Sequence, residues 1–393
     1  MAEWLSIIGI GEDGMTGLRE PALQALSRAQ AVFGGPRHLA MITHPDKRAW
    51  PVPFDLGPLL ALRGQNVAML VSGDPFWFGA GSSVAAYLGP DEWQTFPQVS
   101  CFSMIAAHLG WRLEEVPCLG LHARALSALR PHLTQGARVM LTLRDGQACG
   151  ELADYLAIMG WGDSTLHIFE AMGGPHERRI TVRASDWGSP SESQLVAAAV
   201  EVQGTGQPLG CASGRADDLF ENDGQITKRP IRALALSALA PRPGELLWDI
   251  GAGSGSIGIE WMLAHPRCRA IAIEQDGTRL ARARTNARAL GAIDLDLRLG
   301  RALDLLADLP SPNAVFIGGG ADQALLEALW QRVRPGTRIV AHAVTLETEA
   351  LLGAWHQTKG GTLLRIDLAE AQPLGIRRGW RAAFPVLQWS VQR

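Results

Sequence analysis

The chain has 393 residues, of which 47% are hydrophobic and 19% are charged, and its formal net charge at pH 7 is -3. This length allows two domains of roughly 150 to 200 residues each, and the composition excludes a disordered or fibrous protein. The small negative charge offers no general attraction for a polyphosphate, which argues against broad nucleic-acid binding.

Neither membrane insertion nor metal binding is indicated. No apolar run reaches the roughly 20 residues of a membrane span, and the opening segment MAEWLSIIGIGEDGMTG lacks the basic region and cleavage site of a signal peptide. The five cysteines form no C-x-x-C pair, which is typical of reduced thiols, and the histidines form no cluster. We expect a cytoplasmic protein without a membrane segment or a metal centre.

The first half of the chain alternates short apolar segments with segments of helical length. The apolar segments are WLSIIGIGEDG at 4–14, AVFGG at 31–35, NVAMLVSGDP at 66–75, ARVMLTLRDG at 137–146 and TLHIFEAMGG at 165–174. Such an alternation predicts an α/β fold.

The SGDP tetrapeptide at 72–75 follows one of these predicted strands. Gly73 and Pro75 suit a tight turn, and Asp74 suits a turn-forming side chain, so a plain turn explains the tetrapeptide without a ligand. The aromatic residues of FWFG at 76–79 could stack on a flat ligand, or they could pack in a core. Both interpretations stay open on these residues alone.

A seam rich in Gly, Ser and Pro separates the two halves at 184–230. Loop-forming composition of this kind marks domain boundaries, so we expect domains at 1–205 and 215–393 with a linker at 206–214. The second half again shows strand-like segments separated by helical lengths. They are ELLWDIGAGSG at 245–255, AIAIEQD at 270–276, LDLRLGRA at 295–302, NAVFIGGG at 313–320 and TRIVAHAV at 337–344.

The segment LLWDIGAGSGSIGIEW at 246–261 reads as a strand, a glycine-rich turn and a helix. It formally fits the dinucleotide motif G-x-G-x-x-G, with Glu274 about twenty residues on. Asp249, at the carboxyl end of the strand, is expected to point toward the ligand and to repel a pyrophosphate. The same carboxylate would favour the ammonium and sulfonium groups of S-adenosylmethionine, and Glu274 would accept from its ribose hydroxyls. The sequence therefore favours S-adenosylmethionine over a dinucleotide.

Longer motifs in both halves resemble known families. The segment 217–261, with ITK shortly before the glycine loop, looks like the decarboxylating methyltransferases of cobalamin biosynthesis. The first half is similar to the tetrapyrrole methyltransferases of that pathway, through GIGEDG at 9–14, VSGDPFWFG at 71–79, PQVSCFSMIAAHLGW at 97–111, LGLHAR at 119–124 and VMLTLRDG at 139–146. The fusion of the two in this order resembles the precorrin-6Y C5,15-methyltransferase family.

The resemblance implies a class III tetrapyrrole methyltransferase fold with two α/β subdomains in the first domain, and a Rossmann-like class I methyltransferase fold in the second. It also implies one S-adenosylmethionine per domain. With Asp249 added from the argument above, the expected cofactor-binding residues are Ser72, Gly73, Asp74, Ser100, Cys101, Thr142, Thr227, Asp249, Gly251, Ala252, Gly253, Ser254, Gly255, Glu274 and Ala302.

The implied reaction is methylation of a precorrin-6 tetrapyrrole at carbons 5 and 15 with loss of carbon dioxide from the ring C acetate, giving precorrin-8. We expect the second domain to methylate carbon 15 and to decarboxylate, and the first domain to methylate carbon 5. Methyl transfer from a sulfonium requires mainly alignment, so no catalytic acid or base is assigned. Arg229, Arg377 and Arg378 are candidates for binding the substrate carboxylates. We expect a homo-oligomer that binds neither nucleic acid nor membranes.

Three alternatives stay open at this point. A nucleic-acid methyltransferase is disfavoured by the net charge and by IGGG at 317–320, where base-amine methyltransferases carry an Asn/Asp-Pro-Pro-aromatic tetrapeptide. An NAD-dependent oxidoreductase is opposed by Asp249. A non-catalytic tetrapyrrole-binding protein that retains both folds is compatible with the sequence.

Overall fold

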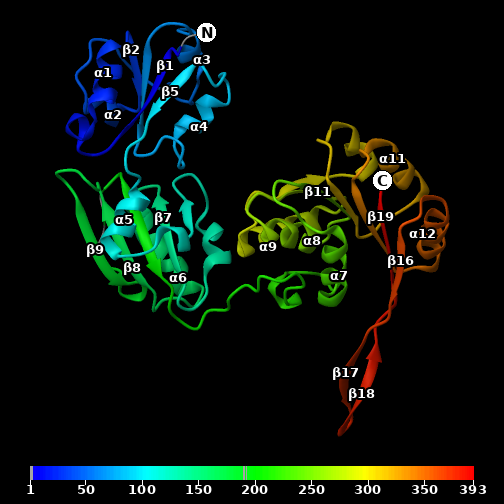
Figure 1. Cartoon of the computed structure of the whole chain (residues 1–393). Helices are drawn as coiled ribbons and strands as arrows, with labels where there is room; N and C mark the ends of the chain where they lie inside the picture. The colour runs from blue at the N-terminus through cyan, green and yellow to red at the C-terminus, as the bar shows by residue number, and fades with distance from the viewer. Residues whose placement is uncertain (1–2, 189–190, 192) are drawn as a thin grey trace. The chain divides into compact units, whose positions relative to one another are not determined.

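The computed structural model describes residues 3–188, 191 and 193–393. The chain divides into two compact units, the first made of residues 1–126 and 132–207 and the second of residues 127–131 and 208–393 (Figure 1). The predicted Gly-, Ser- and Pro-rich seam at 184–230 includes residues 189–190 and 192, which lie outside the described residues. In the part of the chain that is described, no helix has the length and apolar character needed to cross a membrane.

The first unit begins with a parallel five-stranded sheet. Its strand order is β3 (Lys47–Ala49), β2 (Ala31–Gly34), β4 (Val67–Ser72), β1 (Leu5–Ile10) and β5 (Trp93–Phe96). The helices of this part are α1 (Glu20–Arg28), α2 (Pro36–Ala40), α3 (Gly57–Leu60) and α4 (Ala80–Ala85). Every residue of β1 is buried because separate apolar clusters pack on the two faces of the sheet.

A second five-stranded sheet completes the first unit. Its order is β6 (Cys118–Gly120), β7 (Arg138–Leu143), β10 (Val196–Glu201), β8 (Thr165–Glu170) and β9 (Arg178–Arg183). Only β6 and β7 pair in parallel, and the other neighbours are antiparallel. The helices of this part are α5 (Cys101–Leu109) and α6 (Gln147–Ile158). The unit thus has the two α/β parts that the sequence predicted.

The second unit is built on a seven-stranded sheet. Its order is β13 (Asp296–Leu299), β12 (Arg269–Glu274), β11 (Leu246–Ile250), β14 (Ala314–Ile317), β15 (Arg338–Ala343), β19 (Val386–Gln392) and β16 (Thr362–Ile366). The five strands from β13 to β15 run parallel, whereas β19 is antiparallel to both of its neighbours. The order reverses between β11 and β14, so loops at their carboxyl ends diverge and leave a crevice.

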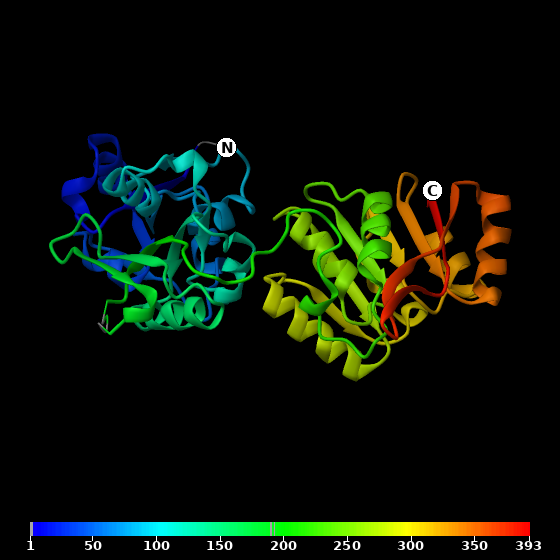
Figure 2. The ribbon, with the colours of Figure 1, turned by 90° about the horizontal axis from the view of Figure 1, so that it is seen from below.

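Helices cover both faces of this sheet, as the two views show (Figures 1 and 2). One apolar cluster joins the sheet to α7 (Arg229–Leu239), α8 (Ser256–Ala264) and α9 (Gly277–Leu290). The other joins the opposite face to α11 (Gln323–Arg332) and α12 (Leu346–Lys359). The short helix α10 (Ala302–Leu305) follows β13. Pro230 lies in the first turn of α7, where backbone N–H groups make no hydrogen bond within the helix, so the missing N–H of proline costs nothing.

A two-stranded arm extends from the second unit between β16 and β19. It consists of β17 (Ala369–Leu374) and β18 (Arg377–Ala382), joined by a two-residue turn in which Gly375 has a φ of +59°. The arm carries large apolar side chains on its surface, and Leu374, Ile376 and Trp380 are 71%, 102% and 78% exposed. Its side chains therefore have little of the burial that stabilises a sheet.

Candidate functional site

The glycine-rich loop after β11 turns by means of three positive-φ residues. Gly251, Gly253 and Gly255 have φ values of +69°, +56° and +76°, a region that residues with a Cβ seldom adopt. A Cβ on Gly251 would lie 2.9 Å from the carbonyl oxygen of Gly319, so this glycine also permits a close approach of two loops. A Cβ on Gly253 would meet only the carbonyl oxygen of Gln225, at 3.7 Å, and would project over the open side of the loop.

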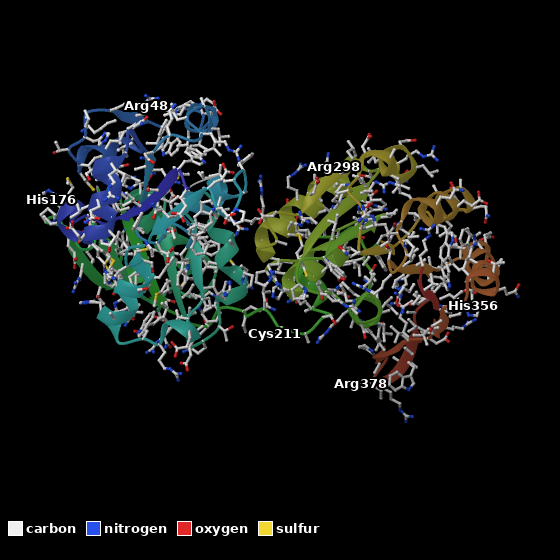
Figure 3. All side chains as sticks on the ribbon, turned by 45° about the horizontal axis from the view of Figure 1, so that its top comes forward. Arg48, His176, Cys211, Arg298, His356 and Arg378 are labelled. Carbon is white, nitrogen blue, oxygen red and sulfur yellow. The ribbon has the colours of Figure 1, made fainter. Side chains whose placement is uncertain are left out.

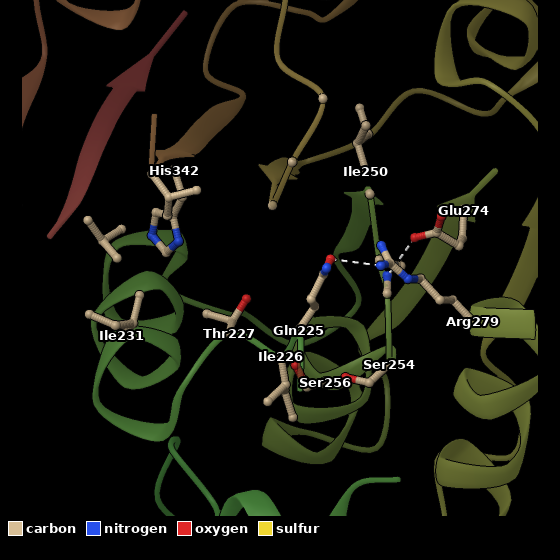
Figure 4. A pocket seen from close by; sticks show the side chains of 18 of the residues that line it. Gln225, Ile226, Thr227, Ile231, Ile250, Ser254, Ser256, Glu274, Arg279 and His342 are labelled. Atoms are coloured by element: carbon tan, nitrogen blue, oxygen red, sulfur yellow. Dashed lines mark hydrogen bonds between the residues drawn. The ribbon is translucent and has the colours of Figure 1, made fainter. Parts of the chain in front are cut away.

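A cavity of about 1440 Å³ lies at the carboxyl ends of β11 and β14 (Figure 4). It exceeds the roughly 300 to 1000 Å³ of an ordinary small-molecule pocket, and thus has room for a large ligand beside a cofactor. The lining residues are 224–228, 231, 250–254, 256, 273–275, 279, 300–303, 318–320, 322, 325, 342, 344, 368, 381–384 and 386.

Most of the second-domain residues predicted to bind a cofactor meet in this cavity. Those that line it are Thr227, Gly251, Ala252, Gly253, Ser254, Glu274 and Ala302. Gly255 lies behind them, where a Cβ would be 3.0 Å from Ala283 on α9. The segment that carries Thr227 is held by Arg279, which donates to Gln225 Oε1 at 2.7 Å (Figure 4). Arg279 also donates to Asp223 Oδ2 at 3.0 Å.

Glu274 ends β12 and connects the glycine loop to the next turn. Its Oε2 accepts from the N–H of Gly253 at 2.8 Å and its Oε1 from the N–H of Asp276 at 3.0 Å. Only 5% of the residue is exposed, yet it forms part of the cavity wall. A carboxylate held in this way can accept further hydrogen bonds from ligand hydroxyls.

Asp249 does not face the cavity, contrary to the expectation from the sequence. Side chains alternate along β11, so Asp249 shares the face of Leu247 beneath α8, and its Oδ2 accepts from the N–H of Gly258 at 2.9 Å. The residue is 1% exposed and burial raises the pKa of its carboxyl to about 7. The predicted direct contact with a cofactor is therefore corrected to a support under the glycine loop.

The three arginines proposed to bind substrate do not line the cavity either. Arg229 is exposed at the first position of α7. Arg377 and Arg378 lie on the arm, where Figure 3 labels Arg378, and neither is among the residues that line the cavity. A strand advances by roughly 3.3 Å per residue, so the arm carries its turn away from the cavity and leaves only its base, with Arg381, in the wall.

Some residues that line the cavity on the side opposite Glu274 were not predicted from the sequence. They include His342 on β15 and, at the base of the arm, Arg381 and Phe384. His342 lies in TRIVAHAV, where a polar side chain interrupts an apolar strand near its carboxyl end, and that interruption was an available signal. Arg381 carried no such signal because the arm was not predicted.

In the first unit, the predicted turn at 72–75 packs against the ends of β1 and β5. The N–H of Gly73 donates to the carbonyl of Ile10 at 3.1 Å, and the N–H of Gln98 donates to the carbonyl of Gly73 at 3.2 Å. Gly73 has a φ of +56°, and Asp74 Oδ1 accepts from the N–H of Phe76 at 2.8 Å, as in a turn-forming aspartate. Ser72 Oγ accepts from Arg37 Nη2 at 2.8 Å.

The other predicted first-domain residues follow the neighbouring strands. Ser100 caps α5 by accepting from the N–H of Ser103 at 3.1 Å, and Cys101 begins that helix. Burial raises the pKa of the Cys101 thiol to about 11, so this cysteine stays protonated at neutral pH. Thr142 lies on β7 with its Oγ1 3.2 Å from His122 Nδ1.

Aromatic packing brings the turn at 72–75 toward the second sheet of the first unit. The Phe78 ring lies 2.8 Å from where a Cβ on Gly120 would be, and Gly120 is the β6 partner of Thr142. Phe78 and Trp77 both pack on Phe102 of α5, with ring centroids 5.8 and 6.0 Å apart. These contacts place aromatic side chains between the two sheets of this unit. In the described part of the whole chain, no three His, Cys, Asp or Glu side chains are grouped to hold a metal ion.

Comparison with known proteins gives a match for each unit. A family described as tetrapyrrole (corrin/porphyrin) methylases matches residues 5–187, and a precorrin methyltransferase domain matches residues 218–393. A relative from Sinorhizobium sp, named precorrin-6Y C(5,15)-methyltransferase [decarboxylating], is 45% identical over 398 aligned residues. The alignment covers 99% of this chain and 96% of the relative.

Two other relatives match only part of the chain. A probable cobalt-precorrin-6B C(15)-methyltransferase (decarboxylating) from Saccharolobus solfataricus is 37% identical over 142 residues, covering 34% of this chain and 71% of the relative. A cobalt-precorrin-7 C(5)-methyltransferase from Salmonella typhimurium is 29% identical over 182 residues, covering 44% of this chain and 88% of the relative.

Proposed function

Because the chain belongs to the precorrin-6Y C5,15-methyltransferase (decarboxylating) family, we propose that it methylates precorrin-6Y at carbons 5 and 15 and removes carbon dioxide from the ring C acetate. The product is precorrin-8, an intermediate of cobalamin biosynthesis. The observation that carries this proposal is the large cavity of the second unit, with a glycine loop and Glu274 on one side and His342, Arg381 and Phe384 on the other.

The cofactor side of this cavity fits S-adenosylmethionine. The positive-φ glycines leave backbone in place of side chains at the wall, which suits close approach of a methionine portion. Glu274 is fixed by two backbone N–H groups and can accept from ribose hydroxyls. When bound, the sulfonium supplies an activated methyl group, and the residues of the wall need only align it with the nucleophilic ring carbon.

The substrate side fits a polycarboxylate with a flat, conjugated body. Arg381, Arg301 and Lys228 contribute positive charge to the wall, and Phe384 and Val344 contribute apolar surface. In the corrected assignment Arg381 takes the place of Arg377 and Arg378 as the arm residue that binds a substrate carboxylate.

We further propose a division of labour, in which the second unit methylates carbon 15 and decarboxylates and the first methylates carbon 5. Each unit then binds its own S-adenosylmethionine, with Ser72, Gly73, Asp74, Ser100, Cys101 and Thr142 at the site of the first. Support comes from the separate relatives named for C(15) methylation with decarboxylation and for C(5) methylation.

Two single-site variants of the full chain test this division. Gly253→Val places a branched side chain over the open face of the second glycine loop, and Gly73→Val forces a β-branched residue into a φ of +56° in the first. Each variant is incubated anaerobically with precorrin-6Y and labelled S-adenosylmethionine, and the product masses are measured. The unmodified chain should add two methyl groups and release carbon dioxide.

The Gly73→Val chain should add one methyl group and still release carbon dioxide, whereas the Gly253→Val chain should release none. A mixture of the two variants should restore the complete product. Release of carbon dioxide by Gly253→Val would show that the reactions are assigned to the wrong units. Tight pigment binding by the unmodified chain without any turnover would favour a non-catalytic tetrapyrrole-binding protein.

We propose that the chain acts in the cytoplasm as a homo-oligomer and binds no nucleic acid. The exposed apolar residues of the arm support self-association, because a two-stranded ribbon with side chains such as Ile376 and Trp380 in water gains stability when another surface covers them. The net charge of -3 gives no support for binding to polyphosphates.

A further inference from the structure

His342 stands at the side of the cavity opposite Glu274, as Figure 4 shows. It lies on β15 and is 6% exposed. Its ring packs edge-on against Phe316, with centroids 5.0 Å apart and an interplanar angle of 88°. The side chain is therefore held in one orientation by packing, with part of the ring at the cavity wall.

The hydrogen bonds of His342 identify which ring nitrogen carries the hydrogen. Gln388 uses its amide nitrogen to donate to Ser390 Oγ at 3.3 Å, so its Oε1 faces His342 Nε2 at 3.0 Å. That oxygen can only accept, and the hydrogen is accordingly assigned to Nε2. Among the described residues no hydrogen bond to Nδ1 is present, so its lone pair can take up and release a proton.

Few other groups in this cavity can supply a proton near neutral pH. Among the described residues that line it, the acidic ones are Glu274, which accepts from two backbone N–H groups, and Asp322, which accepts from the N–H of Leu325. The arginines keep their protons. Lys228 is the other candidate donor, and it is exposed.

Decarboxylation requires a proton at a defined carbon. The bond between the acetate CH₂ carbon and the carboxyl carbon breaks, carbon dioxide leaves, and the electron pair stays on the CH₂ carbon and spreads into the conjugated ring system. This carbon must then gain a proton to become a methyl group. Methylation at carbon 15 releases the hydrogen of that carbon as a proton, so methylation at carbon 15 and decarboxylation together neither consume nor release a proton.

We propose that His342 is the catalytic acid of the decarboxylation, and that its Nδ1 delivers the proton to the former acetate CH₂ carbon. This inference rests on the proposed function of the second unit. Burial lowers the pKa of His342, so the imidazole is neutral until a substrate carboxylate enters and favours its protonated form. Loss of carbon dioxide moves that negative charge from the carboxylate to the CH₂ carbon and the conjugated ring system, and transfer of the imidazole proton to this carbon neutralises it.

The test compares the unmodified full chain with His342→Gln, His342→Ala and His356→Gln under the anaerobic assay. His356 lies on α12, outside the cavity. Glutamine at 342 can still donate to Gln388 but cannot transfer a proton from its amide. We expect His342→Gln to keep methyl transfer to carbon 15 and to slow carbon dioxide release by about 100-fold or more, the usual contribution of a positioned acid. A product that has gained methyl groups and kept all of its carboxyl groups should accumulate. His356→Gln, the matched control, should decarboxylate at nearly the unmodified rate.

Rescue by added imidazole distinguishes a role of His342 in proton transfer from a purely structural role. Added imidazole should restore decarboxylation to His342→Ala, because the lost ring leaves space beside Phe316. Decarboxylation by His342→Gln at the unmodified rate would overturn the proposal, as would equal loss of both reactions without rescue by imidazole. An unmodified chain that transfers no methyl group would instead remove the proposed function, and this inference with it.

Discussion

At the scale of single residues, Asp249 shows how a conspicuous acid can support a site without touching its ligand. It lies two positions before the first glycine of the loop, where a carboxylate could contact a cationic cofactor. In the structure its Oδ2 instead accepts from the N–H of Gly258, in the first turn of α8, and its Oδ1 has no hydrogen-bond partner among the described residues. Burial holds its carboxyl partly protonated near neutral pH, since the pKa is about 7.

Asp249→Asn should change how stability depends on pH. The ordinary pKa of 3.8 applies in the unfolded chain and about 7 in the folded one, so the carboxyl destabilises the folded state progressively as pH rises from 4 to 7. The side-chain amide of asparagine does not ionise over this pH range. The free energy of unfolding of the variant, relative to the unmodified chain, should rise over that interval by on the order of 2 to 4 kcal/mol. Urea unfolding of the second unit at pH 5, 6, 7 and 8 measures it. A difference that is constant with pH would mean that the buried carboxyl is ionised throughout.

Single residues also show how much of the candidate site could be predicted from the sequence. The residues of the glycine loop and Glu274 meet at one cavity because a strand, a turn and a helix fix their positions locally. Asp249 was misplaced because alternation along the strand decides which face a side chain takes, and the sequence does not say which face the ligand uses. His342 was overlooked because its role depends on Gln388, which is brought beside it only by the antiparallel pairing of β15 with β19. The proposed cofactor contacts of the first unit stay predictions.

At the scale of elements, an ion network fixes the segment that carries Thr227. Glu260 on α8 has no exposed side-chain surface and accepts from the N–H groups of Gly214 and Arg215 and from Arg232 Nε at 2.7, 2.9 and 2.6 Å. Arg232 on α7 also donates to Asp217 Oδ1 at 3.0 Å and to the carbonyl of Thr227. Two helices thereby hold a segment that would otherwise be a loose loop beside the cavity.

Arg232→Met should lower the free energy of unfolding of the second unit by about 3 to 5 kcal/mol, because it leaves the Glu260 carboxylate buried without its main partner. The KM for S-adenosylmethionine should rise more than kcat falls, since the displaced segment lines the cofactor side. Arg284→Met, at an exposed position of α9, is the matched control and should change neither. The double variant Arg232→Met with Glu260→Gln should lose less stability than the sum of the two single losses. Additive losses would show that the two side chains are not coupled.

The arm should mediate self-association. Replacing Ile376 and Trp380 by serine removes two large apolar side chains that are almost wholly exposed, and should convert the oligomer to a monomer without unfolding the second unit. Light scattering during gel filtration measures the mass. Ile158→Ser in the first unit, at a side chain that is 83% exposed, is the control and should leave the mass unchanged. A monomeric unmodified chain would contradict the proposal directly.

The strands that the sequence predicted share one property. All ten quoted segments contain strands, and most of these strands are continuous apolar runs in the middle of a sheet, such as β1 and β11. Most of those missed are exposed or short. The arm strand β18 has the sequence RRGWRA and no buried residue, and the three-residue β6 is too short to show a pattern. These segments are strands because they pair with a neighbouring strand, and their own sequence pattern does not show that pairing.

At the scale of the whole molecule, the chain holds two units with different sheets. The first contains a parallel sheet and a mixed sheet, and the second a seven-stranded sheet with one reversal of strand order. Each has its own apolar clusters, so neither depends on the other for its core. Under the proposed division of labour, fusion provides the two activities in equal amounts.

The number of cofactors that the chain binds and the limits of its domains can be tested together. If each unit has its own site, calorimetry should find two molecules of S-adenosylmethionine bound per full chain and one per Gly253→Val chain. Polypeptides of residues 1–205 and 215–393 should fold separately and bind one each. Apart from residues 127–131, which group with the second unit, the chain passes from the first unit to the second at 207/208, and the cluster of the glycine-loop domain includes only Leu209 from before residue 215. A single binding event in the unmodified chain that Gly253→Val abolishes would place the only cofactor site in the second unit. In that case the turn at Ser72–Asp74 would be structural, and the second methyl group would have to come from the same glycine loop.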